Sequence, residues 1–153
     1  MRRGYLYENA KKLGCNKIAL GHHFDDVIET IMISILYAGQ YQTMMPKLKS
    51  TSHPGMELIR PLYFVRETDI INWANKNELD FIKCACRFTE NILTDDSNLE
   101  KSKRLQVKNL LKQLRQKDPI IDKNIFKSSE NVNIDTVLGY KTKQKKISFL
   151  DNY

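Results

Sequence analysis

Residues 17–38, KIALGHHFDDVIETIMISILYA, hold the pattern that decides the fold. The apolar run within Lys17–Leu20 is short and bounded by turn-prone residues, which is typical of a buried parallel strand. From Asp26 to Ala38, apolar residues recur every three or four positions, as they do on one wide face of a helix. A strand followed at once by an amphipathic helix predicts an α/β layer.

The segments on either side of this unit have the same alternating character. Before it, Arg3–Leu13 has leucine and alanine at helical spacing and is followed by Gly14, a residue that often caps a helix. After it, residues 39–55 contain two prolines and several serines and threonines, which favours an exposed loop. Met56–Leu62 is apolar again and predicts a second strand, which ends at Pro61 because proline has no N–H to donate to a ladder.

Two further helices are expected towards the carboxyl end. Arg66–Lys76 predicts a helix whose inward side is made by Ile70, Ile71, Trp73 and Ala74. Beyond Asp96, leucines and a valine line one side of a long helix, while most lysines and arginines lie off that side. We therefore expect an α/β part over residues 1–97 and a basic helical extension over residues 98–153, with a polar tail that is partly mobile.

Charge is distributed unevenly between these two parts. Residues 1–97 contain 12 Lys or Arg against 12 Asp or Glu, whereas residues 98–153 contain 13 against 6, so the whole net charge of +7 belongs to the extension. Cationic surfaces attract nucleic acids because neutralising the phosphates releases condensed counterions. The basic helix from Asn98 to Lys117 is therefore the expected contact with RNA, and a solvated lysine-rich surface is the alternative.

Composition limits the class of protein. With 153 residues, 41% of them hydrophobic, the chain has apolar material for one ordinary core. It has no apolar run near the roughly 20 residues of a membrane helix, and no secretory signal at its amino terminus, so we expect a cytoplasmic protein without a membrane partner. Three cysteines do not suit a disulfide framework. Cys15 is expected to be a buried structural residue, whereas Cys84 and Cys86 could be metal ligands.

The junction between the first strand and the amphipathic helix carries the residues suited to chemistry. Gly21–Thr30, GHHFDDVIET, places two imidazoles and three carboxylates where a parallel strand ends, and open α/β sheets bind ligands at such ends. The first helical turn can hold an anion, while Asp25 and Asp26 could hold Mg²⁺ together with substrate phosphates. A local explanation is also open, because Asp26-x-x-Glu29 has the spacing of a helix capping box.

Three blocks of sequence resemble a known family. GHHFDDVIETIMISILYAGQ, MMPKL and IRPLYFVRETDI occur in this order and resemble the PP-loop ATP pyrophosphatase family of tRNA 2-thiocytidine synthetases over about residues 2–90. The resemblance implies part of a doubly wound, parallel-sheet domain of the adenine nucleotide alpha hydrolase-like type. It also implies that a tRNA cytidine is adenylated with ATP and that its oxygen is then replaced by sulfur.

The resemblance also implies roles for individual residues. The nucleotide and substrate site would contain Gly21, His22, His23, Asp25 and Asp26. Of these, Asp25 or Asp26 would make the magnesium or catalytic contact. Arg60 lies in the third block and could bind a phosphate through its forked guanidinium, or form a surface salt bridge.

Two features of the family are not found in this sequence. The glycine-rich SGGxDS loop, which holds the pyrophosphate of ATP, would precede Met1, and none of the six glycines replaces it. Because the backbone N–H groups of such a loop orient the phosphates, we expect the chain alone to be inactive, as part of a split or degenerate enzyme. A C-x-x-C pair would also lie upstream. Cys84 or Cys86 would then supply the remaining ligand of a 4Fe–4S cluster whose other ligands lie outside this chain.

Two other functions stay open at this point. One is a related tRNA-modifying ligase of the same family, which would not need a thiolate at Cys84 or Cys86. The other is a non-catalytic RNA-binding or regulatory remnant. In every case tRNA is an expected partner, ATP is expected for the two enzymes, and the sulfur donor is open. A homodimer is also expected, because strands missing from the domain would leave apolar faces uncovered.

Overall fold

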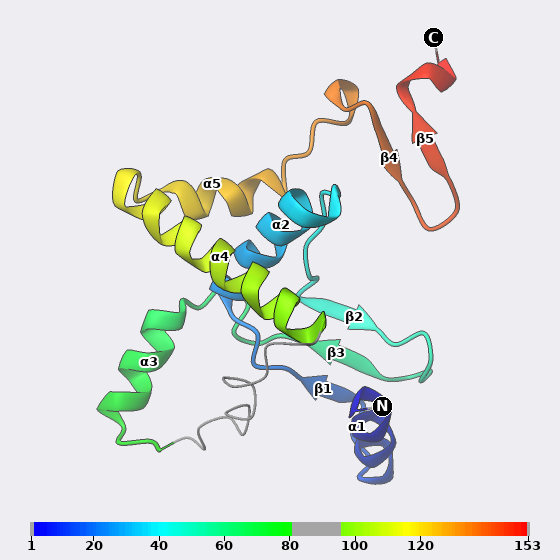
Figure 1. Cartoon of the computed structure of the whole chain (residues 1–153). Helices are drawn as coiled ribbons and strands as arrows, with labels where there is room; N and C mark the ends of the chain where they lie inside the picture. Colours follow the sequence, from blue (N-terminus) through cyan, green and yellow to red (C-terminus); the bar gives the residue numbers. More distant parts are fainter. Residues whose placement is uncertain (1, 81–95, 153) are drawn as a thin grey trace.

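The computed structural model describes residues 2–80 and 96–152. A small sheet carries the strands β1, β2 and β3, and three helices, α2, α4 and α5, gather beside it, with a hairpin beyond them at the carboxyl end (Figure 1). Helices and strands alternate along the amino-terminal part, so the predicted α/β class is confirmed. Within the described residues, none of the helices has the length and hydrophobicity needed to span a membrane.

The first helix follows the sequence prediction closely. α1 spans Arg2–Lys12 and is followed by Gly14, whose φ of 71° is a left-handed conformation that glycine adopts without strain. The N–H of Cys15 donates to the carbonyl of Ala10 at 2.8 Å, which satisfies one of the last carbonyls of the helix. Cys15 itself is exposed, so its predicted burial is wrong. It lies just beyond the helix end, where no described side chain covers it.

The sheet has three strands in the order β1-β3-β2. β1 (Lys17–Ala19) runs parallel to β3 (Glu57–Ile59), as the sequence predicts for a crossover through a helix. β1 is only half-buried at its centre, because within the described residues it has a neighbour on one edge alone. β2 (Lys47–Lys49) pairs antiparallel with β3 and lies inside the segment expected to be a loop. Three alternating residues are too few to indicate a strand from sequence.

α2 (Phe24–Ala38) is the centre of the core. Its predicted apolar face is buried at Val27, Ile28 and Ile31, whereas Ile35 and Leu36 near its end are 43% and 50% exposed. The helix ends at Gly39, whose φ is 58°. One side of α2 packs against Tyr63, while the other packs against α4 (Asp96–Lys117). The buried side chains of the two clusters are Val27, Ile31 and Tyr63 in the first, and Phe24, Ile28, Val107 and Leu111 in the second. α5 (Ile121–Ser128) adds Ile125 and Phe126 to both clusters.

The extension therefore shares its core with the α/β part. The expected boundary between residues 97 and 98 falls inside the first turn of α4, and the buried face of that helix rests on α2. The long amphipathic helix that the sequence predicts beyond Asp96, from apolar residues spaced three and four apart, is confirmed as α4. Its tertiary contact with α2 was not predictable from that spacing.

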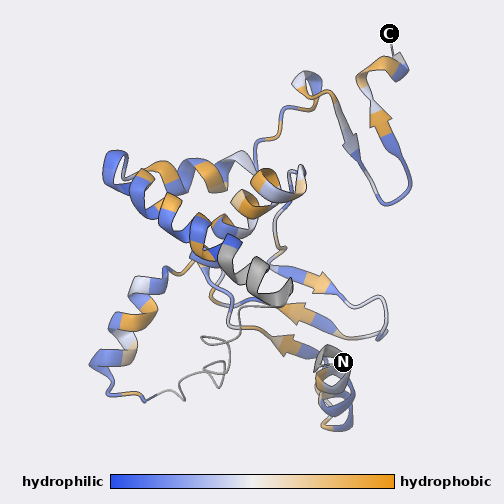
Figure 2. Ribbon diagram, viewed as in Figure 1, coloured by the Kyte–Doolittle hydropathy of each residue, from blue (hydrophilic) through white to orange (hydrophobic). Residues whose placement is uncertain are grey.

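α3 (Glu67–Lys76) forms where the sequence predicts a helix, but its predicted inward side is wrong. Only Ala74 is buried, whereas Ile71 and Trp73 are 50% and 59% exposed. Figure 2 shows apolar residues on this helix, which projects away from the three-helix cluster. Amphipathic spacing indicates which side of a helix is apolar, but no described element packs against the apolar side of α3.

A β-hairpin lies in the tail that the sequence left without regular structure. After a short 3₁₀ turn at Ile134–Thr136 (η2), β4 (Gly139–Lys141) pairs antiparallel with β5 (Lys146–Ser148), and a second 3₁₀ turn, η3 (Phe149–Asn152), follows. The hairpin stands apart from the helices at the carboxyl end (Figure 1). Its strands have three residues each, too few to show alternating polar and apolar residues, and the turn lacks a common hairpin pair such as Asn-Gly.

Replacing Gly139 with alanine is expected to open this hairpin. A Cβ at this position would lie 2.5 Å from the carbonyl oxygen of Ile147, a backbone atom of the opposite strand, so the strands must separate. We expect the hairpin amides to exchange with deuterium at least about tenfold faster, as local opening becomes easier. Gly4→Ala is the matched control, since an added Cβ there meets nothing within 4 Å. Unchanged exchange in the Gly139 variant would contradict the prediction.

Candidate functional site

The carboxyl ends of two parallel strands bring the predicted nucleotide-binding residues together. Gly21–His23 follow β1, and Arg60 follows β3, whose pairing with β1 continues through the bond from the Leu20 N–H to the Ile59 carbonyl at 2.9 Å. The Nε of Arg60 donates to Nδ1 of His22 at 3.3 Å, and its Nη1 donates to the carbonyl of Met45. A buried guanidinium thus contacts an imidazole 38 residues away in sequence.

The start of α2 fixes His23 and Asp26. The N–H of His23 donates to Oδ2 of Asp26 at 3.1 Å, so Asp26 closes the first turn of the helix. The interpretation of Asp26-x-x-Glu29 as a capping box is therefore wrong. The helix begins at Phe24, two residues earlier than expected, and the N–H of Phe24 is held by the Val65 carbonyl at 2.9 Å. The pair that spans the first turn is consequently His23 and Asp26.

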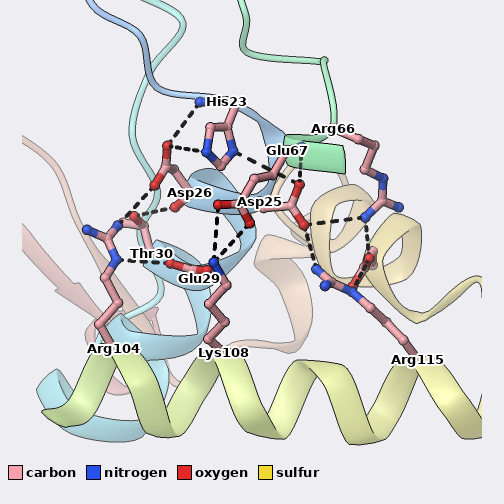
Figure 3. Close-up of polar contacts among 11 residues, drawn as sticks. His23, Asp25, Asp26, Glu29, Thr30, Arg66, Glu67, Arg104, Lys108 and Arg115 are labelled. Carbon is pink, nitrogen blue, oxygen red and sulfur yellow. Dashed lines mark hydrogen bonds and ion pairs between the residues drawn. The ribbon is translucent and has the colours of Figure 1, made fainter. Parts of the chain in front are cut away.

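Asp25 points away from Asp26 and is enclosed by other elements. Its Oδ2 accepts a bond from the backbone N–H of Glu67 at 2.9 Å, and its Oδ1 accepts one from Nη2 of Arg115 at 2.7 Å. Nη1 of Arg66 lies 3.8 Å from the same Oδ1. With only 6% of Asp25 exposed, both carboxylate oxygens are already used to join α2 to the start of α3 and to α4 (Figure 3).

Asp122 completes this buried charge network. Its Oδ2 accepts from Nε of Arg115 at 2.7 Å and also from Nη1 of Arg66. Asp122 is 1% exposed, and its other oxygen is buried without a hydrogen-bond partner in the described structure. Two carboxylates and two guanidiniums therefore connect α2, α4, α5 and the residue preceding α3. Arg66 also lies over the ring of Phe24, 4.5 Å from its centre.

Sequence reasoning missed this network because its members are far apart in the chain. Asp25 and Arg115 are separated by 90 positions, and no local spacing connects them. Arg66 and Glu67, adjacent in sequence, take different partners: Arg66 pairs with Asp122, while Glu67 pairs with Lys108. Within the sequence, the only available signal is an aspartate at position 122 directly after two isoleucines, at the start of a short helix.

A hollow of about 320 Å³ lies on the other side of Asp26. Its polar contacts are drawn in Figure 3: Nε of Arg104 donates to Oε2 of Glu29 at 2.9 Å, and Nζ of Lys108 donates to Oε2 of Glu67 at 2.9 Å. Nη2 of Arg104 is also 3.5 Å from Oδ1 of Asp26. The lining residues are His23, Asp26, Glu29, Glu67, Arg104, Leu105 and Lys108.

Protonation equilibria in this hollow are shifted by burial and by pairing. Burial raises the pKa of Glu29, even though Arg104 beside it acts in the opposite direction. The hydrogen bond with Glu67 raises the pKa of Lys108, which therefore keeps its charge. A carboxyl group that holds its proton more readily than usual, in a hollow near a strand end, is a candidate for acid–base chemistry. Sequence reasoning had assigned Glu29 only to the helix start.

The candidate metal ligands divide into those that the structure places and those that it does not. Cys84 and Cys86 lie outside the described residues. Among residues 2–80 and 96–152, no group of three or more His, Cys, Asp or Glu side chains is arranged to hold a metal ion. A divalent cation bound near Asp26 would therefore take part of its coordination shell from phosphates and water, as Mg²⁺ commonly does.

Comparison with known proteins places these features in a family. A model of the PP-loop domain matches residues 1–93. A tRNA-cytidine(32) 2-sulfurtransferase of Coxiella burnetii is 36% identical over 141 residues, which cover 92% of this chain and 51% of the relative. The enzyme of that name from Shewanella denitrificans is 40% identical over 133 residues, covering 87% of this chain and 38% of the relative. The chain thus spans about half, or less, of the length of these relatives.

A solved structure supports the same assignment. The U34-tRNA thiolase NcsA from Methanococcus maripaludis, determined with its [4Fe-4S] cluster, superposes with a TM-score of 0.64 and 25% sequence identity. The match covers 84% of this chain and 40% of the thiolase chain. The resemblance inferred from three sequence blocks is confirmed, as is the fold that it implied. By its sequence, its strand order and these similarities, the chain belongs to the PP-loop domain family.

Proposed function

We propose that this chain is part of an ATP-dependent tRNA sulfurtransferase that adenylates a tRNA cytidine and replaces its oxygen with sulfur. The observation that carries the proposal is the convergence of Gly21–His23 and Arg60 at the ends of two parallel strands, beside the hollow that contains Asp26. Ligands bind at this edge in open α/β sheets. Relatives that match 86–92% of the chain are tRNA-cytidine(32) 2-sulfurtransferases, which supports the choice of reaction.

The chemistry of the hollow is suited to a magnesium nucleotide. Mg²⁺ prefers oxygen ligands and usually retains phosphates in its shell, and Asp26 and Glu29 supply carboxylate oxygens there. Arg104 and Lys108, both about half exposed, supply positive charge for phosphate oxygens. We assign the magnesium or catalytic contact to Asp26, because Asp26 lines the hollow, whereas Asp25 is buried and both of its oxygens hold the helices together. Asp25 is then a positioning residue.

We assign Gly21, His22, His23 and Arg60 to the nucleotide-binding edge. Arg60 is buried and donates to His22, so one role for it is to fix the orientation of that imidazole. His23 lies against Asp26, with Nε2 of the ring 3.4 Å from Oδ2 of the carboxylate. In this arrangement Arg60 would hold His22, and the start of α2 would hold His23 and Asp26, before any substrate binds. Less conformational entropy would then be lost when the substrate binds.

An iron–sulfur cluster is part of the proposal, through Cys84 or Cys86. The solved thiolase carries a [4Fe-4S] cluster, and thiolates are the ligands that such clusters require. In a thiolation enzyme the cluster would carry sulfur to the activated base. A single pair of thiols cannot complete the shell, so the other ligands would come from outside this chain. A homodimer also stays a proposal, with the exposed Ile71 and Trp73 of α3 as its candidate surface.

A hybrid enzyme tests the proposed function. We define it as this chain joined to the part of the Coxiella burnetii relative that lies outside the matched region. Produced in a bacterial strain without its own tRNA cytidine sulfurtransferase, the hybrid is expected to restore 2-thiocytidine, measured by mass spectrometry of digested tRNA. Cys84→Ser together with Cys86→Ser is expected to abolish it.

Each alternative function gives a different result in this test. A related ligase would modify tRNA with another group, and its activity would survive loss of both thiols. A non-catalytic remnant would bind tRNA without modifying it, and its binding would not change in the Asp26→Asn variant. Either result would overturn the sulfurtransferase proposal. Cys15→Ser is the matched control, because Cys15 is an exposed thiol beyond the end of α1.

A further inference from the structure

The basic hairpin, defined here as residues 139–148, concentrates positive charge in its turn. It has four lysines within six positions, at Lys141, Lys143, Lys145 and Lys146, and all four are exposed. Among the described residues, none of these lysines forms an ion pair with a carboxylate. The hairpin therefore presents the positive charge of these lysines to solvent. It lies at the carboxyl end of the chain (Figure 1).

The hairpin ladder forces like charges together. Lys141 lies directly opposite Lys146 in the antiparallel register, and such directly opposed pairs place their side chains on the same face. Like charges in this position are destabilising. The turn is closed by a bond from the Thr142 N–H to the Lys145 carbonyl at 2.8 Å, which holds the turn lysines beside this pair. An anion bound between them would relieve the repulsion, so the geometry favours a polyanionic ligand.

Three cations of α4 are held by carboxylates of the same molecule, although the sequence favoured that helix as the RNA contact. Arg104 is paired with Glu29 and Asp26, Lys108 with Glu67, and Arg115 with Asp25 and Asp122. These three cations lie towards α2 and α3, on the side of the candidate site. The other exposed lysines of α4 and α5 are spread along the two helices, whereas the hairpin gathers four exposed lysines within six positions.

The position of the hairpin separates it from the candidate site. It lies near the carboxyl end of α2, where Tyr140 and Lys141 line a hollow of about 720 Å³ together with residues 39–42. The candidate site lies at the amino end of the same helix. Since α2 has 15 residues, its two ends are about 22 Å apart. A long RNA could occupy both places at once, whereas a single nucleotide could not.

We propose that the basic hairpin binds the phosphate backbone of the tRNA at a distance from the nucleotide that reacts. The choice of RNA among polyanions rests on the proposed function. Contacts of this kind position a nucleic acid without reading its sequence. In the complete enzyme the hairpin acts on substrate binding and leaves the chemical step unchanged.

Salt-dependent binding tests this proposal with the full chain. An unmodified tRNA transcript, labelled for fluorescence anisotropy, is titrated at several salt concentrations between 50 and 200 mM, a range over which phosphate contacts differ measurably. The hairpin variant replaces all four lysines with glutamine. Its affinity is expected to fall at least about tenfold near 0.1 M salt, and the slope of log K against log salt to fall by about 3, as for four lost phosphate contacts.

A matched variant controls for net charge. It carries the same substitution at four exposed lysines outside the hairpin, namely Lys11, Lys12, Lys49 and Lys76. Its salt slope is expected to stay within about 1 of the original. Equal losses in the two variants would overturn the proposal, since net charge alone would then explain binding. Absence of tRNA binding by the unaltered chain would also overturn it. Thermal melts of both variants should show no loss of stability, because every altered side chain is exposed and the hairpin variant also loses the repulsion between Lys141 and Lys146.

The hybrid enzyme separates failure of this inference from failure of the proposed function. There, the hairpin variant is expected to raise KM for tRNA about tenfold or more with kcat unchanged, because the contact is made equally before and during the reaction. A lower kcat with unchanged KM would overturn the positioning role. If the hybrid does not thiolate while the hairpin variant still loses tRNA affinity, the sulfurtransferase proposal fails and the RNA-binding hairpin stands.

Discussion

Replacing Asp26 with asparagine in the hybrid enzyme is expected to lower kcat for tRNA thiolation about 100-fold or more, as removal of a charge-stabilising catalytic group commonly does. The carboxylate lines the hollow near the strand ends, and in the proposed function its charge holds a divalent cation against the phosphates. Asparagine keeps an oxygen that can accept the bond from the His23 N–H, so the start of α2 is preserved. Single-turnover formation of 2-thiocytidine measures the effect.

The control for this prediction is the same substitution at Asp69. That residue lies in the first turn of α3, is exposed, and lines no part of the hollow. Asp69→Asn is expected to leave both kcat and KM within about twofold of the original, as surface substitutions away from a site usually do. A rate for Asp26→Asn close to that of Asp69→Asn would remove Asp26 from the catalytic machinery and return it to helix capping alone.

The second large effect is expected on stability. Asp122→Asn should lower the free energy of unfolding by about 3 kcal/mol, because removing one partner of a buried ionic network leaves the other charges uncompensated. Asp122 is 1% exposed and accepts hydrogen bonds from Arg66 and Arg115, which are themselves held near Asp25. For a chain of this size the melting temperature should fall by about 10 °C.

Thermal and urea unfolding, each followed by circular dichroism, measure this change. Asp135→Asn is the matched control, since Asp135 is an exposed aspartate in the 3₁₀ turn before the hairpin, and its loss should alter stability by less than about 0.5 kcal/mol. If the two variants unfold alike, the buried network does not hold α4 and α5 against α2. In that case the packing of Val107 and Leu111 would account for the association alone.

The sequence was sufficient for features that depend on neighbouring residues. The apolar spacing of residues 26–38 predicted most of α2 and the side on which its buried residues lie, because a helix brings positions three and four apart onto one side. Gly14 marked the end of α1 for an equally local reason, since a left-handed φ favours glycine. The assignment of His22 and Arg60 to strand ends was made separately for each residue, and only the parallel pairing of β1 with β3 brings the two side chains into contact.

Predictions failed where the outcome depends on what lies nearby in space. The apolar side of α3 was assigned inward from its spacing, yet Trp73 is 59% exposed because no described element packs over it. The capping interpretation placed the cap three residues too late, at Asp26 instead of His23, because the Val65 carbonyl binds the Phe24 N–H and the helix begins there. The hairpin and β2 have three-residue strands, whose stability comes from pairing partners more than from their own sequence.

By itself, the sequence determined the α/β class, the family and the small set of residues at the strand ends. The tertiary structure alone decided how the charges are used. Asp25 and Asp26 are adjacent in sequence, but α4 packs against α2 so that Arg115 reaches one and Arg104 approaches the other. The physical reason is that burial of apolar side chains fixes where the helices meet. That meeting decides which cations pair with carboxylates inside the molecule and which lysines, those of the hairpin among them, stay exposed to solvent.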